Sequence, residues 1–155
     1  MKRSFLVLVF LALALPGLLS AQQDDFGVGI VLGEPTGLSL KKWLGGRSAV
    51  DAALAWSFTD GGAFHVHVDY LRHDFTLIQV REGSLPFYYG IGGRLKHDNN
   101  APDPTTVSAR APVGLSYMFQ NHPIDIFFEV ALLLDITPES KLAVNSGVGF
   151  RYYFR

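Results

Sequence analysis

The sequence predicts an all-β protein, an eight-stranded antiparallel up-and-down transmembrane β-barrel with a side-chain-filled polar lumen. Three observations lead to this fold class. Eight segments alternate between apolar residues and polar or small ones with a period of two, which is typical of strands with two different faces. The second face collects glycine, alanine and charges of both signs. No segment after the N-terminal leader reaches 18 consecutive apolar residues, so membrane insertion would require a closed barrel.

Composition narrows the class of protein further. The 155 residues carry 13 Lys and Arg against 14 Asp and Glu, which gives no basic field for nucleic acid. Only 17% of the residues are charged, against roughly 25% in soluble domains, whereas 48% are hydrophobic and 13% aromatic. Cysteine is absent, which excludes a disulfide scaffold, a thiolate metal site and a lipidated N-terminal cysteine.

Residues 1–21 have the features of a cleaved secretory signal peptide. Lys2 and Arg3 precede an apolar run from Phe5 to Leu15, and residues 19–21 supply a plausible cleavage site. A membrane anchor is the alternative, but this run of 11 residues is short of the roughly 20 that a spanning helix needs. We therefore expect residues 22–155 to form a single β-barrel domain with 11 basic and 14 acidic side chains.

Of the first four predicted strands, the third alternates most regularly. The four are Phe26–Gly33, Leu38–Leu44, Val50–Phe58 and Phe64–Tyr70. The sequences Glu34–Gly37, Gly45–Gly46 and Thr59–Gly62 separate them and are rich in turn-forming residues. Residues 72–86 fit neither a strand nor a short turn, and we interpret them as an extension of the fourth strand past a bulge, with a turn at Glu82–Ser84.

Four more strands follow. They are Phe87–Lys96, Ser108–Phe119, Ile124–Asp135 and Val144–Phe154. Pro112 removes one ladder hydrogen bond from its strand and predicts a bulge there. The longest exposed loops are expected at His97–Val107 and Ile136–Leu142.

The polar face is predicted to point into the barrel. Its many glycines and alanines suit the crowded lumen of a narrow barrel better than a solvated surface. Its charges are nearly balanced, which suggests an internal ion-pair network, since unpaired charges in a lumen are costly. The expected network consists of Lys41, Asp51, Asp69, Arg94, Lys96, Arg110, Asp125, Glu129 and Arg151, with Asp135 as a further acid. A solvated face of mixed charge is the alternative.

Aromatic residues on the apolar face gather toward the segment ends, as in interfacial girdles. They are Phe26, Trp56, Phe58, Phe64, Tyr70, Phe87, Tyr89, Tyr117, Phe119, Tyr152 and Phe154. Aromatic rings also pack in soluble cores, so this pattern supports the membrane interpretation without excluding a soluble barrel.

One segment offers residues with chemical potential. His65, His67 and Asp69 share one face of one predicted strand, at a spacing that can share a metal ion. The hairpin register sets Ser57 opposite His65, which resembles part of a hydrolase triad. The favoured interpretation is that these side chains join the hydrogen-bond network of the lumen. We therefore predict no catalytic residue, no cofactor and no metal.

The whole chain after the leader resembles the small eight-stranded bacterial outer-membrane barrels of the OmpA/OmpX type. The match lies in the export signal, the eight alternating segments and the aromatic last strand, Gly147–Phe154, which is followed by Arg155. Two further stretches, Gly33–Gly37 and Leu85–Gly92, resemble an uncharacterised family of predicted small outer-membrane barrels, which brings no assigned activity. The resemblance implies a location in the bacterial outer membrane, contact with its lipid, and recognition of the last strand by the barrel-assembly machinery.

These observations predict a non-enzymatic protein with a structural or surface-interaction role. Eight strands leave no wide channel, so an open pore is not expected. An extracellular partner would bind the loops. Two alternatives stay open: a lipid-modifying barrel enzyme that uses Ser57, His65 and His67, and a soluble periplasmic lipocalin-like barrel that binds an apolar ligand.

Overall fold

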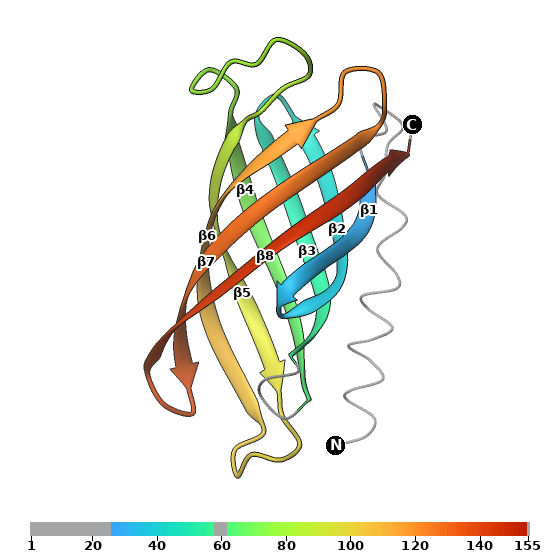
Figure 1. Cartoon of the computed structure of the whole chain (residues 1–155). Helices are drawn as coiled ribbons and strands as arrows, with labels where there is room; N and C mark the ends of the chain where they lie inside the picture. The colour runs from blue at the N-terminus through green and yellow to red at the C-terminus, as the bar shows by residue number, and fades with distance from the viewer. Residues whose placement is uncertain (1–25, 58–61, 155) are drawn as a thin grey trace.

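The computed structural model describes residues 26–57 and 62–154, which form a closed antiparallel barrel (Figure 1). Its eight strands are β1 (Phe26–Glu34), β2 (Thr36–Gly45), β3 (Ser48–Ser57), β4 (Ala63–Asp74), β5 (Phe87–His97), β6 (Thr105–Met118), β7 (Ile124–Thr137) and β8 (Lys141–Phe154). The predicted signal peptide, Phe58, the turn residues 59–61 and Arg155 lie outside the described residues. Within the described ranges, no helix is long and apolar enough to cross a membrane.

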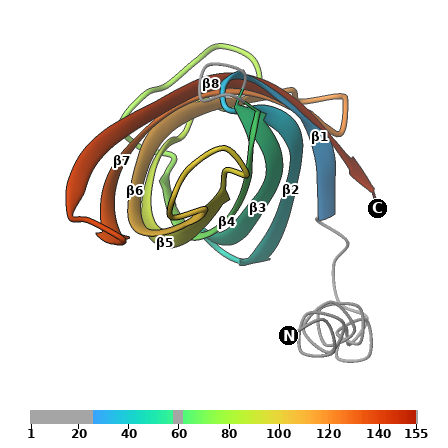
Figure 2. The ribbon, with the colours of Figure 1, turned by 90° about the horizontal axis from the view of Figure 1, so that it is seen from below.

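Each strand pairs with the next along the chain, and β8 returns to pair with β1. The closing ladder runs from Phe26 opposite Phe154 to Glu34 opposite Ser146. The view along the axis shows the strands as a ring (Figure 2). The predicted all-β, eight-stranded, up-and-down barrel is therefore confirmed.

The two faces of the strands point as the alternation predicts. The exposed apolar side chains on the outside include Ile30, Val68, Ile91, Leu95, Val113, Phe128, Leu132 and Val148. The buried side chains on the inside include Lys41, Asp51, Asp69, Arg94, Arg110, Asp125, Glu129 and Arg151. The large apolar residues are thus mainly outside and the charges inside, the reverse of a soluble barrel.

β4 continues further along the chain than predicted and contains no bulge. The strand runs without a bulge to Asp74, because its pairing with β5 is continuous from Phe64 opposite His97 to Asp74 opposite Phe87. Leu71 is apolar yet points inward, where its side chain fills the space beside Gly90. The rule that polar residues point inward and apolar residues outward therefore fails at this position. Only residues 75–86 form a loop, which turns at Gly83 with a φ of +72°.

Pro112 does not produce the predicted bulge. The register between β6 and β7 is continuous through Pro112, and the observed shift lies between Val107 and Ser108. On the other side of β6, the ladder to β5 is interrupted between the pairs Tyr89–Val113 and Gly92–Arg110. The missing N–H of proline is therefore accommodated by a gap in one ladder rather than by an extra residue.

The connections differ in length from those expected. One end of the barrel carries Phe26, Phe154 and the connections 46–47, 75–86 and 119–123. The opposite end carries Pro35, the end of β3, the start of β4 and the connections 98–104 and 138–140. The two predicted loops are shorter than expected, because strands continue into both of them. The longest connection is instead 75–86, at the upper end of the barrel in Figure 1.

Candidate functional site

The lumen is the site where the polar side chains gather, and Arg151 of β8 joins three other strands there. Its Nη2 lies 3.2 Å from Asp51 Oδ2 and its Nη1 lies 3.4 Å from Asp125 Oδ2. Its Nε donates a 2.8 Å hydrogen bond to the hydroxyl of Ser39. The guanidinium also lies over the ring of Phe127, 3.7 Å from the centroid. Arg151 thereby links β2, β3 and β7 through the interior.

Arg110 of β6 occupies a similar position across the lumen. It forms ion pairs with Asp69 of β4 and, at 2.5 Å, with Glu129 of β7. The Tyr88 hydroxyl donates a 2.9 Å hydrogen bond to the second oxygen of Glu129. Arg110 therefore ties β4 to β6 and β7, neither of which is a neighbour of β4 in the sheet.

Nearer the end of the barrel that holds Pro35, Arg94 of β5 is the third arginine that forms an ion pair. Its Nη2 lies 2.9 Å from Asp135 Oδ1. Ser108 Oγ accepts a hydrogen bond from Arg94 and donates one of 2.5 Å to Asp135. Lys96, two residues further along β5, is half-buried.

Lys41 does not join a carboxylate as the expected network implied. Its Nζ lies 2.8 Å from His73 Nε2, and 4.5 Å from the centroid of the Trp43 ring. Among the residues that the structure describes, no carboxylate forms an ion pair with it. His73 and Trp43 were missed by the sequence analysis, although both sit at inward positions of their strands. Continuing the alternation past Asp69 and Lys41 would have found them.

Hydroxyl groups complete the interior network and were also missed. Asp125 accepts hydrogen bonds from Tyr153, at 2.7 Å, and from Ser116, at 3.0 Å. Such hydroxyls carry no charge and give no distinctive signal in a sequence. Their role follows only from the register that brings β6, β7 and β8 together.

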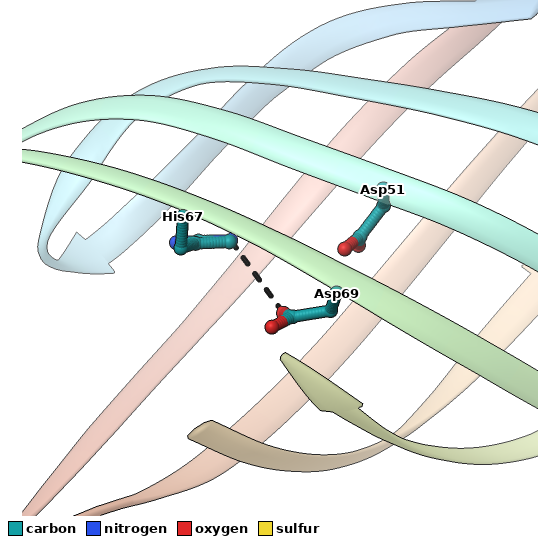
Figure 3. Close-up of side chains that lie close together, drawn as sticks. All are labelled: Asp51, His67 and Asp69. Atoms are coloured by element: carbon teal, nitrogen blue, oxygen red, sulfur yellow. Dashed lines mark ion pairs between the residues drawn. The ribbon is translucent and has the colours of Figure 1, made fainter. Parts of the chain in front are cut away.

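The structure regroups the residues that the sequence singled out for metal binding or catalysis. Ser57 pairs with Ala63, and His65 with Ala55, so the predicted Ser57–His65 pairing is wrong by one inward position. Asp51 and Asp69 instead face each other directly across β3 and β4. Asp51, His67 and Asp69 each offer one ligand atom within 4.8 Å of the others (Figure 3), and His65 is not part of this group.

Glycines on the inner face leave room for the aromatic rings and carboxylates that point into the lumen. A Cβ at Gly149 would overlap the ring of Phe127, and one at Gly92 would overlap the carboxylate of Asp69. With these side chains in place, the internal cavity beside Asp51, His67, Arg110 and Arg151 measures only about 30 Å³. It extends to Pro35 in the connection between β1 and β2.

A larger hollow opens at the end of the barrel that holds Phe26 and Phe154. It measures about 270 Å³ and is lined mainly by apolar and aromatic side chains, among them Trp43, Phe75 and Phe119. It lies above the Lys41–His73 contact, because Trp43 borders both. Its lining residues all lie at or near this end of the barrel.

Comparisons with known proteins identify the fold but no closer relative. No family model matches the sequence, and no curated protein matches it. Among solved structures, the N-terminal β-barrel domain of Pseudomonas aeruginosa OprF superimposes with a TM-score of 0.62 and 12% sequence identity. The match covers 85% of this chain and 98% of that domain. The chain therefore has the fold of the OprF N-terminal barrel, which confirms the resemblance to OmpA-type barrels at the level of fold.

Proposed function

We propose that the protein is a bacterial outer-membrane β-barrel with a structural or surface-interaction role and no open pore. The observation that carries the proposal is the orientation of the two strand faces. Large apolar side chains point outward from every strand, and the buried charges point inward. Water does not favour such an exterior, whereas a lipid bilayer does.

The aromatic residues support placement across a bilayer. Eight of the exterior aromatics lie near the end that holds Phe26 and Phe154: Phe26, Tyr70, Phe87, Tyr89, Tyr117, Phe119, Tyr152 and Phe154. Trp56 and Phe64 lie near the opposite end, with ring centroids 5.3 Å apart. Two aromatic bands flanking an apolar belt are the expected exterior of an outer-membrane barrel.

The lumen supports a role other than general diffusion. Arg110 and Arg151 each cross the interior to carboxylates on two strands, and Tyr88 and Phe127 fill the space beside them. A cavity of about 30 Å³ holds a water molecule or two and no larger solute. The barrel thus serves as a membrane anchor, and its ends and loops are the surfaces available to partners.

Neither alternative is favoured by the geometry. A lipid-modifying enzyme would need its nucleophile within reach of lipid, but Ser57 and His65 are both buried on the lumen side. A lipocalin-like barrel would need its apolar face around an internal ligand, but that face is outside. The proposal therefore assigns no reaction to the protein.

Two measurements test the proposal. Isolated outer membranes should contain the protein, and its SDS gel band should migrate differently unheated and boiled, because closed membrane barrels resist SDS until heated. Purified protein in a planar bilayer should give no stable conductance. A soluble periplasmic protein without a band shift would refute the membrane location. A steady open channel would refute the filled lumen, while leaving the membrane location intact.

The proposed partners can be tested separately. The barrel-assembly machinery would bind β8, whose outward Tyr152 and Phe154 form an edge-to-face pair with centroids 5.2 Å apart. Replacing both with Ala should slow assembly in cells, measured as unfolded protein in the gel-shift assay. Equal assembly of this variant and the wild type would show that the aromatic residues of β8 are not part of the recognition signal. A surface partner would bind the connection 98–104, at the end of the barrel opposite Phe26 and Phe154.

A further inference from the structure

We propose that Asp51, His67 and Asp69 form a binding site for one divalent transition-metal ion, such as Zn²⁺, inside the barrel. The three side chains come from the adjacent strands β3 and β4 (Figure 3). All three are buried, and one ligand atom of each lies within 4.8 Å of the other two. Imidazole nitrogen and carboxylate oxygen are ordinary ligands of zinc and related ions.

The register of β3 and β4 places two carboxylates directly opposite each other. Asp51 and Asp69 are direct partners in the β3–β4 ladder, and like charges at this position destabilise a sheet. Each aspartate leaves its Oδ1 buried and without a hydrogen-bond partner. A cation between these strands would satisfy both carboxylates.

His67 provides independent support, because it is a buried polar side chain without a hydrogen-bond partner. It is 9% exposed, and its buried Nδ1 has no partner among the described residues. Its Nε2 lies 3.9 Å from Asp69 Oδ2, too far for a hydrogen bond. The imidazole is thus held beside the aspartates without being used by the rest of the network.

The charge balance in the middle of the lumen also favours a divalent cation. Two guanidiniums, of Arg110 and Arg151, are shared among four carboxylates: Asp51, Asp69, Asp125 and Glu129. The next cation along the lumen, Lys41, contacts His73 instead of a carboxylate. Buried charge without a counter-charge is strongly unfavourable, so additional positive charge beside Asp51 and Asp69 would stabilise the folded barrel.

The site has the space and the access that an ion requires. In a tetrahedral zinc site, ligand atoms lie about 3.4 Å apart, so small rotations of the three side chains would complete it. The cavity of about 30 Å³ beside Asp51 and His67 has room for a water molecule as a fourth ligand. The same cavity reaches Pro35, which gives the ion a short path from that end of the barrel.

The test uses the full chain, purified in detergent and shown to be folded by its unheated SDS band. Equilibrium dialysis should give one Zn²⁺ per chain, and Co²⁺ should give the visible absorption bands of a low-coordinate site. His67→Gln should weaken Zn²⁺ binding by at least about tenfold, since even partners outside the ligand shell contribute that much. Asp51→Asn should have a similar effect.

His65→Gln is the matched control. His65 is buried on the same strand, two residues before His67, and lies outside the group. This variant should bind Zn²⁺ like the wild type. Folded wild-type protein that takes up neither ion would overturn the proposal, whatever the variants do. Loss of binding in His65→Gln with retention in Asp51→Asn would also overturn it, because the ligands would then be a different set.

Discussion

At the scale of single residues, the arginines of the lumen determine how its charges are arranged. Arg151 is 1% exposed and contacts Ser39, Asp51 and Asp125, which lie on three different strands. A guanidinium suits this position, because its planar fork presents several donors in fixed directions. The cost of desolvating such a group is offset only while its partners remain in place.

Replacing Arg151 with Ala is therefore expected to destabilise the barrel strongly. Asp51 and Asp125 would lose their cation while staying buried, which should lower the free energy of unfolding by about 3–5 kcal/mol. The measurement is a urea titration of the protein in lipid vesicles, followed by gel shift.

A conservative variant and a surface control accompany this prediction. Arg151→Lys keeps the charge but loses the fork, so its stability should fall between those of Arg151→Ala and the wild type. Arg81→Ala removes an exposed arginine from the loop 75–86, and should change the free energy of unfolding by no more than about 0.5 kcal/mol. Equal stabilities of Arg151→Ala and Arg81→Ala would show that the internal ion pairs contribute nothing.

The sequence indicates which residues enter the lumen better than it indicates which of them meet. Alternation places Asp51, Asp69 and Arg110 on the inner face, because each strand has only two faces. Their pairing depends on the relative register of β3, β4 and β6 and on the width of the barrel, which no single segment encodes. For this reason the candidate ligands considered within one strand, His65 to Asp69, are not the residues that come together, and the observed group spans two strands.

At the scale of the strands, the outer face of β4 presents an apolar surface that would contact lipid under the proposed function. Val68 is 52% exposed and lies between Phe64 and Tyr70 on the same face. Its ladder partners, Ala52 and Gly93, are small, so nothing from the neighbouring strands covers it. In water such a position would tolerate almost any side chain.

Val68→Arg distinguishes a bilayer from water around the barrel. In a bilayer, an arginine near the midplane should lower the free energy of unfolding by about 2–4 kcal/mol. The measurement is denaturant unfolding in lipid vesicles. Leu77→Arg, in the loop 75–86, is the control, because Leu77 is 64% exposed outside the strands and should tolerate the charge. A Val68→Arg protein as stable as the wild type would show that this face does not contact lipid.

Sequence patterns predict strands well where the two faces differ clearly, and less well where they do not. β3 alternates in side-chain size and polarity along its length, and its predicted start and end lie within a few residues of the observed ones. The end of β4 was misjudged because Leu71 is an apolar residue on the inner face. The bulge predicted at Pro112 was wrong, because the missing N–H leaves a gap in the β5–β6 ladder instead. Whether a proline causes a gap or a bulge depends on the neighbouring strand.

At the scale of the whole molecule, an even number of strands places both ends of the described chain at the same end of the barrel. Phe26 and Phe154 are paired there, and the longest connection, 75–86, lies at that end too. If the chain inserts from the periplasm, only the shorter connections at the opposite end must cross the membrane. This orientation transfers the fewest polar backbone groups through lipid.

Labelling of single cysteines tests this orientation, and the natural chain contains no cysteine to interfere. In intact cells, a membrane-impermeant maleimide should label Asp103→Cys, in the connection 98–104. It should label Leu77→Cys, in the loop 75–86, only after the outer membrane has been permeabilised. The opposite pattern would place the loop 75–86 outside the cell, and labelling of both positions in intact cells would contradict a fixed orientation.

The position of Arg151 in the last strand has a consequence for the order of biogenesis. Its partners Ser39 and Asp51 precede it by 112 and 100 residues. The contacts of Arg151 at the centre of the barrel can therefore form only after β8 has been made. A chain stalled before β8 would keep unpaired edges on β1 and β7 and uncompensated carboxylates between them. Closure of the ring and the pairing of Asp51 and Asp125 with Arg151 are then a single event. We therefore expect a chain without β8 to be less stable than the closed barrel and to be degraded faster in cells.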